Sequence, residues 1–175
     1  MATHFELFNL APSVDLDVKA LDDLHRKLSL DTHPDRLTGA DSRARRVAAE
    51  KSASLNEAVK VLRDPVRRAF YLLELKGVKL DTEHAAAALK MPMEFLEEIM
   101  ERREALEGAR ASRELSRAQS MAAEIAALKA TSLAAAQAAL RADDVPSASI
   151  ALGKVRYYAR FLEEVEAFEE ELSSS

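Results

Sequence analysis

The chain has 175 residues, 48% of them apolar and 31% charged, which is enough to build a core under a charged surface. It has 33 alanines and 24 leucines but only 10 valines and 3 isoleucines, a mixture that favours helices over sheets. Because there is no cysteine, disulfides, thiol catalysis and cysteine-ligated zinc or iron–sulfur centres are excluded. No run of about 18 apolar residues and no signal-peptide pattern is present, so we expect no membrane span.

The net charge of −5 is unevenly spread. Residues 1–76 contain 13 basic and 12 acidic residues, whereas residues 77–175 contain 12 basic and 18 acidic ones and 23 of the alanines. This change of composition predicts a first domain over 1–76, a linker over 77–84 and a second domain over 85–175.

Apolar spacing predicts three helices in the first domain. The first runs from Asp17 to Leu30 with Asp15 or Asp17 as its N-cap, and it stops before His33 because Pro34 disfavours helical geometry in the preceding residue. The second spans about 41–63, with one apolar face formed by Ala44, Val47, Ala48, Leu55, Ala58, Val59 and Leu62. Asp64-Pro65 then starts a short helix that ends at Gly77.

Residues 77–175 are also predicted to be helical. After a weak helix over 84–90, we expect a helix from Met91-Pro92 to about Glu107, closed by Gly108, and a long helix over about 109–142. Residues 143–146 break the pattern, and the last helix covers about 147–172, with an apolar face formed by Val155, Tyr158, Leu162, Val165 and Leu172. Short connections between long helices favour antiparallel packing, so this half is predicted to be a three-helix bundle and the whole chain to be all-α.

The loop after the first of these helices contains His33-Pro34-Asp35. Histidine and aspartate could form an acid–base pair, but the sequence supplies neither the pocket nor the third group that such a pair needs. Asp31, His33 and Asp35 could ligate a metal, although no second cluster of ligands accompanies them. A polar loop without a function is the remaining alternative. The exposed face of the preceding helix carries Lys19, Arg26 and Lys27, which could equally be an ordinary solvated surface.

The helix from Glu94 to Glu107 has two apolar stripes. One contains Phe95, Ile99 and Leu106, which lie within about 40° of one another and can face a core. The other, roughly 100° away, contains Met93, Leu96 and Met100 and is flanked by glutamates. This second stripe is either an adaptable docking surface or a packing surface for the first domain or for residues 85–90.

The order of helices around His33-Pro34-Asp35 resembles a J-domain. Over nearly its whole length the chain resembles the HscB family, the J-type co-chaperones of iron–sulfur cluster assembly, and it does so most strongly over residues 1–77. The residues that carry this resemblance are His4-Phe5, Leu7-Phe8, Ser52-Ala53, Asn56, Ala58, Leu62-Arg63, Pro65, Arg68-Ala69, Tyr71-Leu72-Leu73, Leu75, Gly77, Phe95-Leu96 and Arg103-Glu104.

The resemblance implies a protein that stimulates the ATPase of a specialised DnaK-class chaperone, HscA, and delivers the scaffold protein IscU to it. It implies no chemistry, cofactor or resident metal in this chain, and it leaves self-association of the bundle open. The residues that it implies for chaperone binding are His33, Pro34, Asp35, Lys19, Arg26 and Lys27. Those that it implies for scaffold binding are Leu96, Glu97, Met100, Glu101, Glu104 and Tyr157.

Three positions depart from the family pattern. Thr32 replaces a usual tyrosine, Glu97 a frequent apolar residue and Gly108 a frequent acid, so the two interfaces could be altered there. The cysteine-rich N-terminal segment of many eukaryotic members is missing, so the chain resembles the bacterial form with a cytoplasmic location.

Three other functions were weighed against this one. A J-domain co-chaperone for a general folding chaperone would favour a glycine-rich linker or a cysteine-rich module, and neither is present. A non-catalytic helical adaptor would not need the His-Pro-Asp motif. Nucleic-acid binding is disfavoured because the chain is acidic and its arginines are interleaved with a core pattern; those arginines are Arg43, Arg45, Arg46, Arg67 and Arg68.

Overall fold

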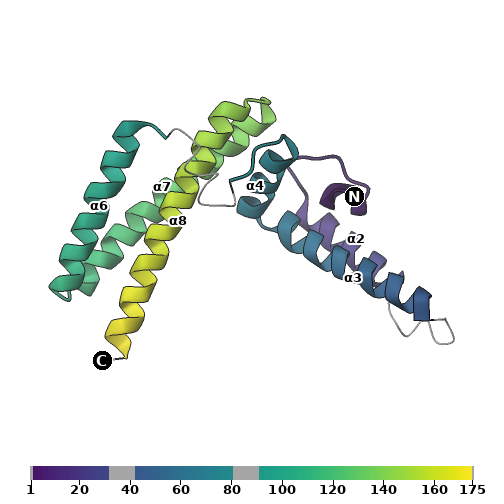
Figure 1. Cartoon of the computed structure of the whole chain (residues 1–175), viewed down its shortest axis with the longest axis horizontal. Coiled ribbons are helices and arrows are strands. Elements are labelled where there is room, and N and C mark those ends of the chain that lie inside the picture. Colours follow the sequence, from purple (N-terminus) through teal and green to yellow (C-terminus); the bar gives the residue numbers. More distant parts are fainter. Residues whose placement is uncertain (1, 32–41, 81–90, 175) are drawn as a thin grey trace. The chain divides into compact units, whose positions relative to one another are not determined.

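The computed structural model describes residues 2–31, 42–80 and 91–174, and within these ranges every regular element is an α-helix (Figure 1). The all-α prediction is therefore confirmed. The chain divides into two compact units, Met1–Leu72 and Leu73–Ser175. The predicted domain limits at residues 76 and 85 stay predictions, and the weak helix expected over 84–90 lies outside the described residues.

The first unit begins with helix α1, His4–Leu7, which is fixed at its start by reciprocal hydrogen bonds between Thr3 and Glu6. The backbone N–H of His4 donates to the Tyr71 hydroxyl at 2.9 Å, and the two rings stack with centroids 4.3 Å apart. Phe5 and Phe8 are buried. The opening aromatic residues are thus part of the core of this unit.

Helices α2, Val18–Asp31, and α3, Ser42–Arg63, form an antiparallel pair. Asp17 caps α2 as predicted, since its carboxylate accepts from the backbone N–H groups of Lys19 and Ala20 at 2.9 and 3.1 Å. The pair is joined by the ion pair between Asp22 and Arg63 and by a 2.9 Å hydrogen bond between His25 and Asn56. The buried leucines between the two helices are Leu21, Leu55 and Leu62.

The predicted apolar face of α3 is only partly a core face. Its second half is buried, but Ala44 is exposed and 57% of the Val47 surface is accessible. The reason is length, because α3 has 22 residues and α2 has only 14. The contacts from α2 to Asn56 and Arg63 place it against the second half of α3.

Helix α4, Pro65–Leu75, has both of its predicted ends. The Asp64 carboxylate accepts from the N–H groups of Val66 and Arg67, each at 2.8 Å, and Pro65 occupies the first helical position. At the other end Gly77 has a positive φ of 88°, which permits the paired bonds from Gly77 to Glu74 and from Val78 to Leu73.

The second unit contains helices α6, Met93–Ala111, α7, Leu115–Arg141, and α8, Val145–Ser173, arranged as the predicted three-helix bundle (Figure 1). Its core is rich in aromatic rings and β-branched residues and is made of Met91, Phe95, Ile99, Leu106, Ala118, Ile125, Tyr158, Phe161, Val165 and Phe168. The predicted face of α8 was slightly misplaced, because Phe161 and Phe168 are buried whereas Leu162 and Leu172 are half-buried.

The predicted end of α6 at Gly108 was wrong. The helix continues to Ala111, and the residue that reverses the chain is Arg113, with φ of 55°. The same reversal occurs after α7 at Asp143, with φ of 58°. Helix α7 therefore begins at Leu115, six residues later than predicted, and α8 begins at Val145, two residues earlier than predicted. Asp144 caps α8 by accepting from the Ser147 N–H at 3.1 Å.

Candidate partner-binding surfaces

The outer face of α2 carries the three cations that the sequence singled out. Lys19, Arg26 and Lys27 are all exposed, whereas Leu21 on the opposite side of the helix is buried. Asp23 shares this face and lies 3.8 Å from Arg26. Both side chains of this pair are exposed, so Asp23 lowers the net positive charge of the face without holding Arg26 in one position.

His33, Pro34, Asp35 and the neighbouring Thr32 lie outside the described residues. The described part of α2 runs to Asp31 and that of α3 starts at Ser42, so the predicted end of α2 before His33 stays a prediction. Two of the three ligands of the metal-site alternative, His33 and Asp35, also lie outside the described residues. Over residues 2–31, 42–80 and 91–174, no group of three metal-ligating side chains is found.

In the bundle, α6 and α8 run parallel along a shared seam. Arg103 on α6 bonds Glu164 on α8 at 2.8 Å, and one heptad later Arg110 bonds Glu171 at 2.6 Å. Both pairs are 61 residues apart in sequence. One heptad earlier, the same separation brings Leu96 level with Tyr157. The sequence analysis predicted this pair for one site, and the register of the two helices gives the physical reason for its proximity.

At the level of Leu96 and Tyr157 the seam contains apolar and aromatic groups instead of an ion pair. Phe95 is buried, and its ring meets the rings of Tyr157 and Tyr158 edge-on, with centroids 5.5 and 5.7 Å away. Leu96 and Tyr157 are half-buried against it. Burial also raises the pKa of the Tyr158 hydroxyl, with a further contribution from the nearby Glu98 carboxylate. This end of the seam is therefore a neutral, ring-lined support for surface side chains.

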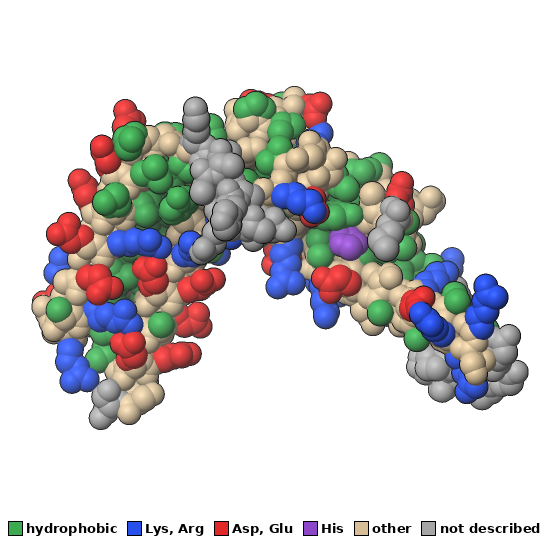
Figure 2. Space-filling model, viewed as in Figure 1, with side chains coloured by type: hydrophobic (Ala, Val, Ile, Leu, Met, Phe, Trp, Pro, Cys, Tyr) green, Lys and Arg blue, Asp and Glu red, His purple; other side chains and the backbone are tan. Residues whose placement is uncertain are grey.

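Two methionines of α6 beside these rings are largely exposed to solvent. Met93 is 69% exposed and Met100 is 70% exposed, although both belong to a helix whose other stripe is fully in the core. Figure 2 shows apolar side chains gathered at this end of the bundle, with acidic and basic side chains mixed further along it. Met93 and Met100 are therefore surface side chains within the described residues. Residues 85–90, one of the two packing partners that the sequence allowed, lie outside the described residues, so the docking interpretation stays a prediction.

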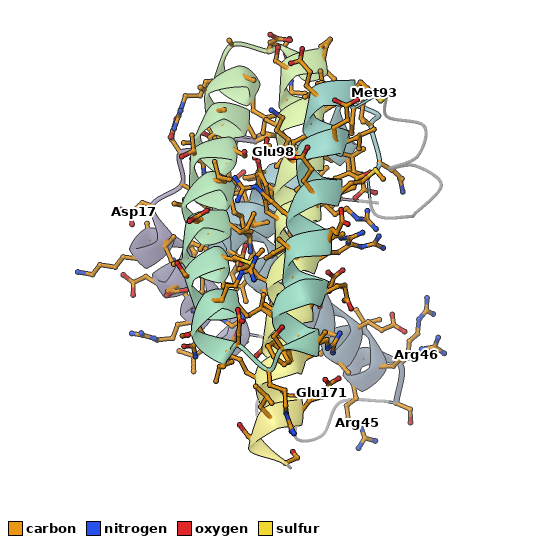
Figure 3. All side chains as sticks on the ribbon, turned by 90° about the vertical axis from the view of Figure 1, so that its left-hand side faces the viewer. Asp17, Arg45, Arg46, Met93, Glu98 and Glu171 are labelled. Carbon is orange, nitrogen blue, oxygen red and sulfur yellow. The ribbon has the colours of Figure 1, made fainter. Side chains whose placement is uncertain are left out.

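The acidic side chains of α6 fall into two groups. Glu98 faces α7 and is bound by Arg102, which also reaches Glu124 of α7, at 3.0 and 3.3 Å (Figure 3). By contrast, three exposed glutamates lie on the outer side of the helix and form no ion pair with any described residue: Glu97, Glu101 and Glu104. The predicted scaffold-binding residues thus share one surface, which combines exposed thioether side chains with carboxylates that are unpaired among the described residues.

One residue beside this surface was missed by the sequence analysis. The Lys154 ammonium lies 5.2 Å from the centroid of the Phe95 ring, one turn before Tyr157 on α8. The available signal was its spacing, because residues three apart on a helix share a face and Tyr157 had already been selected.

Of the helices that the structure describes, none has the length and apolar character that crossing a bilayer requires.

Comparison with solved structures identifies the fold. The chain superposes on the chaperone HscB from Vibrio cholerae with a TM-score of 0.78 and 31% identity, over 98% of this chain and 99% of that one. It superposes on the human co-chaperone HscB with a TM-score of 0.82 and 24% identity, over 97% of this chain and 83% of that one. The protein is therefore an all-helical J-domain co-chaperone.

Sequence comparison identifies the family. The model for the HSCB C-terminal oligomerisation domain matches residues 91–166. The co-chaperone protein HscB homolog of Burkholderia vietnamiensis is 40% identical over 123 residues, which are 70% of this chain and 69% of that protein. The chain belongs to the HscB family of co-chaperones, which serve iron–sulfur cluster assembly.

Proposed function

We propose that this co-chaperone brings an IscU-type scaffold protein to an HscA-type chaperone and stimulates the ATPase of that chaperone. The first unit would contact the chaperone and the bundle would hold the scaffold. A single chain that binds both partners raises their effective concentration for each other without any new contact between them. As in the bacterial form that the sequence resembles, the proposed location is the cytoplasm.

The proposed chaperone contact combines the His33-Pro34-Asp35 motif with the exposed cations Lys19, Arg26 and Lys27. Pro34 restricts the backbone of the motif, and the Asp35 carboxylate can accept a bidentate pair from an arginine of the chaperone. The cations of α2 would attract an acidic chaperone surface, which raises the association rate more than the affinity.

The proposed scaffold contact consists of Leu96, Glu97, Met100, Glu101, Glu104 and Tyr157. The observation that carries it is the exposure of Met93 and Met100 above the half-buried Leu96 and Tyr157. Methionine side chains adapt to an incoming surface, and the unpaired outer glutamates would select a partner with basic groups beside its apolar contact. Self-association of the bundle, which the description of the matched family model names, stays a separate proposal.

The test is steady-state ATP hydrolysis by an HscA-type chaperone, with this protein added in the presence and absence of the scaffold. We expect stimulation by the wild-type protein, a further rise with scaffold, and no stimulation by His33→Gln. Met100→Ala should keep the basal stimulation and lose most of the additional effect of the scaffold. Glu163→Ala, which removes an exposed carboxylate elsewhere on α8, is the matched control and should behave as the wild type.

Each part of the proposal can fail separately. Stimulation that is indifferent to scaffold would remove the scaffold assignment and favour a general J-domain co-chaperone. If the wild-type protein stimulates neither an HscA-type nor a general DnaK-type chaperone, the protein would be a helical adaptor instead.

A further inference from the structure

Lys154 occupies a defined position at the edge of the scaffold-binding surface. The 61-residue separation that relates α6 to α8 places it level with Met93, one turn from the pair of Leu96 and Tyr157. Its ammonium lies 5.2 Å from the centroid of the buried Phe95 ring, and Phe95 also supports Tyr157. The contact with the ring holds the lysine stem against the seam and keeps its charge next to the exposed methionine.

Among the described residues, no carboxylate pairs with Lys154 as glutamates pair with the two arginines of this seam. Arg103 and Arg110 each bond a glutamate of α8, namely Glu164 and Glu171. Lys154 forms no ion pair with any residue in the described ranges, and its ammonium lies beside the Phe95 ring instead. Lys154 is half-buried as a residue, and its ammonium lies against a neutral ring, so an incoming carboxylate would supply an opposite charge that the described residues do not.

We propose that Lys154 determines specificity by receiving a carboxylate of the scaffold protein. This inference rests on the proposed function, because it names a further contact of the same surface. The outer glutamates of α6 would attract basic groups of the partner. Lys154 would attract one acidic group on the opposite side of the exposed methionines, Met93 and Met100. The matching segment of the scaffold therefore carries an apolar side chain with basic groups on one flank and an aspartate or glutamate on the other. Such a two-sign pattern fixes orientation and rejects partners that are uniformly basic.

The test measures the affinity of the full-length protein for the scaffold by calorimetry at about 0.05 M and about 0.5 M salt. A partly exposed ion pair contributes up to about 1 kcal/mol, so Lys154→Met should weaken binding about fivefold at low salt. Lys154→Glu replaces attraction with repulsion and should weaken binding about twentyfold, whereas Lys154→Arg should bind as the wild type. Lys60→Glu makes the same change of net charge on an exposed lysine of α3 and should have no effect.

Salt separates the proposed contact from a structural role. At high salt the screening length falls to a few ångströms, so the deficits of Lys154→Met and Lys154→Glu should shrink. A deficit of Lys154→Met that persists unchanged would mean that the lysine acts through the packing of Phe95 and Tyr157, and this would overturn the inference. Binding by Lys154→Met that equals the wild type at low salt would overturn it as well.

Leu96→Ala distinguishes this inference from the proposal beneath it. If Leu96→Ala weakens scaffold binding while Lys154→Met does not, only the carboxylate contact is wrong. If Leu96→Ala and Met100→Ala both bind as the wild type, the scaffold surface itself is wrong, and the role of Lys154 fails with it.

Discussion

Two single substitutions, Met100→Ala and Ile99→Ala, test whether the two stripes of α6 have different roles. Met100 is 70% exposed, whereas Ile99 is 3% exposed and belongs to the core. Complete burial of a methionine side chain contributes about 1.5–3 kcal/mol, so the covered third of Met100 contributes less than about 1 kcal/mol to folding. Its exposed remainder leaves about 1–2 kcal/mol for a partner, which corresponds to about 5–30-fold in affinity. Ile99→Ala should instead lower the free energy of unfolding by about 2–5 kcal/mol.

Urea denaturation followed by circular dichroism measures the free energy of unfolding, and calorimetric titration with the scaffold measures the binding affinity. Met100→Ala should unfold nearly as the wild type and bind the scaffold more weakly. Val47→Ala, which shortens an exposed apolar side chain of α3, is the control and should change scaffold affinity little. The reasoning is refuted if Met100→Ala loses as much stability as Ile99→Ala, because the second stripe would then be a packing surface.

Three further predictions concern residues in the last turn of a helix or in the connections between helices. Gly108→Ala should raise the free energy of unfolding by about 1 kcal/mol, measured by urea denaturation, because a Cβ there has no atom within 4 Å and alanine favours the helix. Arg113→Gly should raise it by about 0.5–1 kcal/mol, since glycine removes the cost of a left-handed backbone; a loss of stability would contradict this. Hydrogen bonds from Ser147 hold the pKa of Asp144 below its ordinary value, so this contribution to stability is present at neutral pH and is lost as the pH falls through the lowered pKa. Asp144→Asn should therefore show a weaker fall of the urea midpoint on acidification, and an unchanged acid limb would argue against it.

The start of α2 and both ends of α4 could be predicted closely because they depend on local chemistry. Asp17 and Asp64 each accept backbone N–H groups two and three residues later, and Gly77 takes the left-handed conformation that it adopts easily. The end of α6 could not be read in the same way. Gly108 lies within the helix and a non-glycine residue, Arg113, makes the reversal, because packing of the bundle outweighs the local preference of either residue.

The members of the candidate site could be named from the resemblance, but their arrangement could not. Periodicity placed Leu96 and Met100 on one stripe, yet the same pattern allowed that stripe to be buried. The position of Tyr157 depends on the register between α6 and α8, which is fixed by contacts such as the pair of Arg103 and Glu164. Lys154 was missed for the same reason, since its importance comes from the Phe95 ring of another helix.

The register of the seam also gives a physical reason for the place of the proposed binding surface, at one end of the bundle. Two successive heptads of α6 and α8 are joined by arginine–glutamate pairs, which satisfy their own charges and offer little to a partner. In the preceding heptad these pairs are replaced by Leu96 and Tyr157, which cannot satisfy each other electrostatically and present apolar surface instead. The outer glutamates and Lys154 then flank an apolar centre with charges of both signs that form no ion pair with any described residue. We therefore expect recognition at the proposed surface to depend on where the interhelical ion pairs end along the seam.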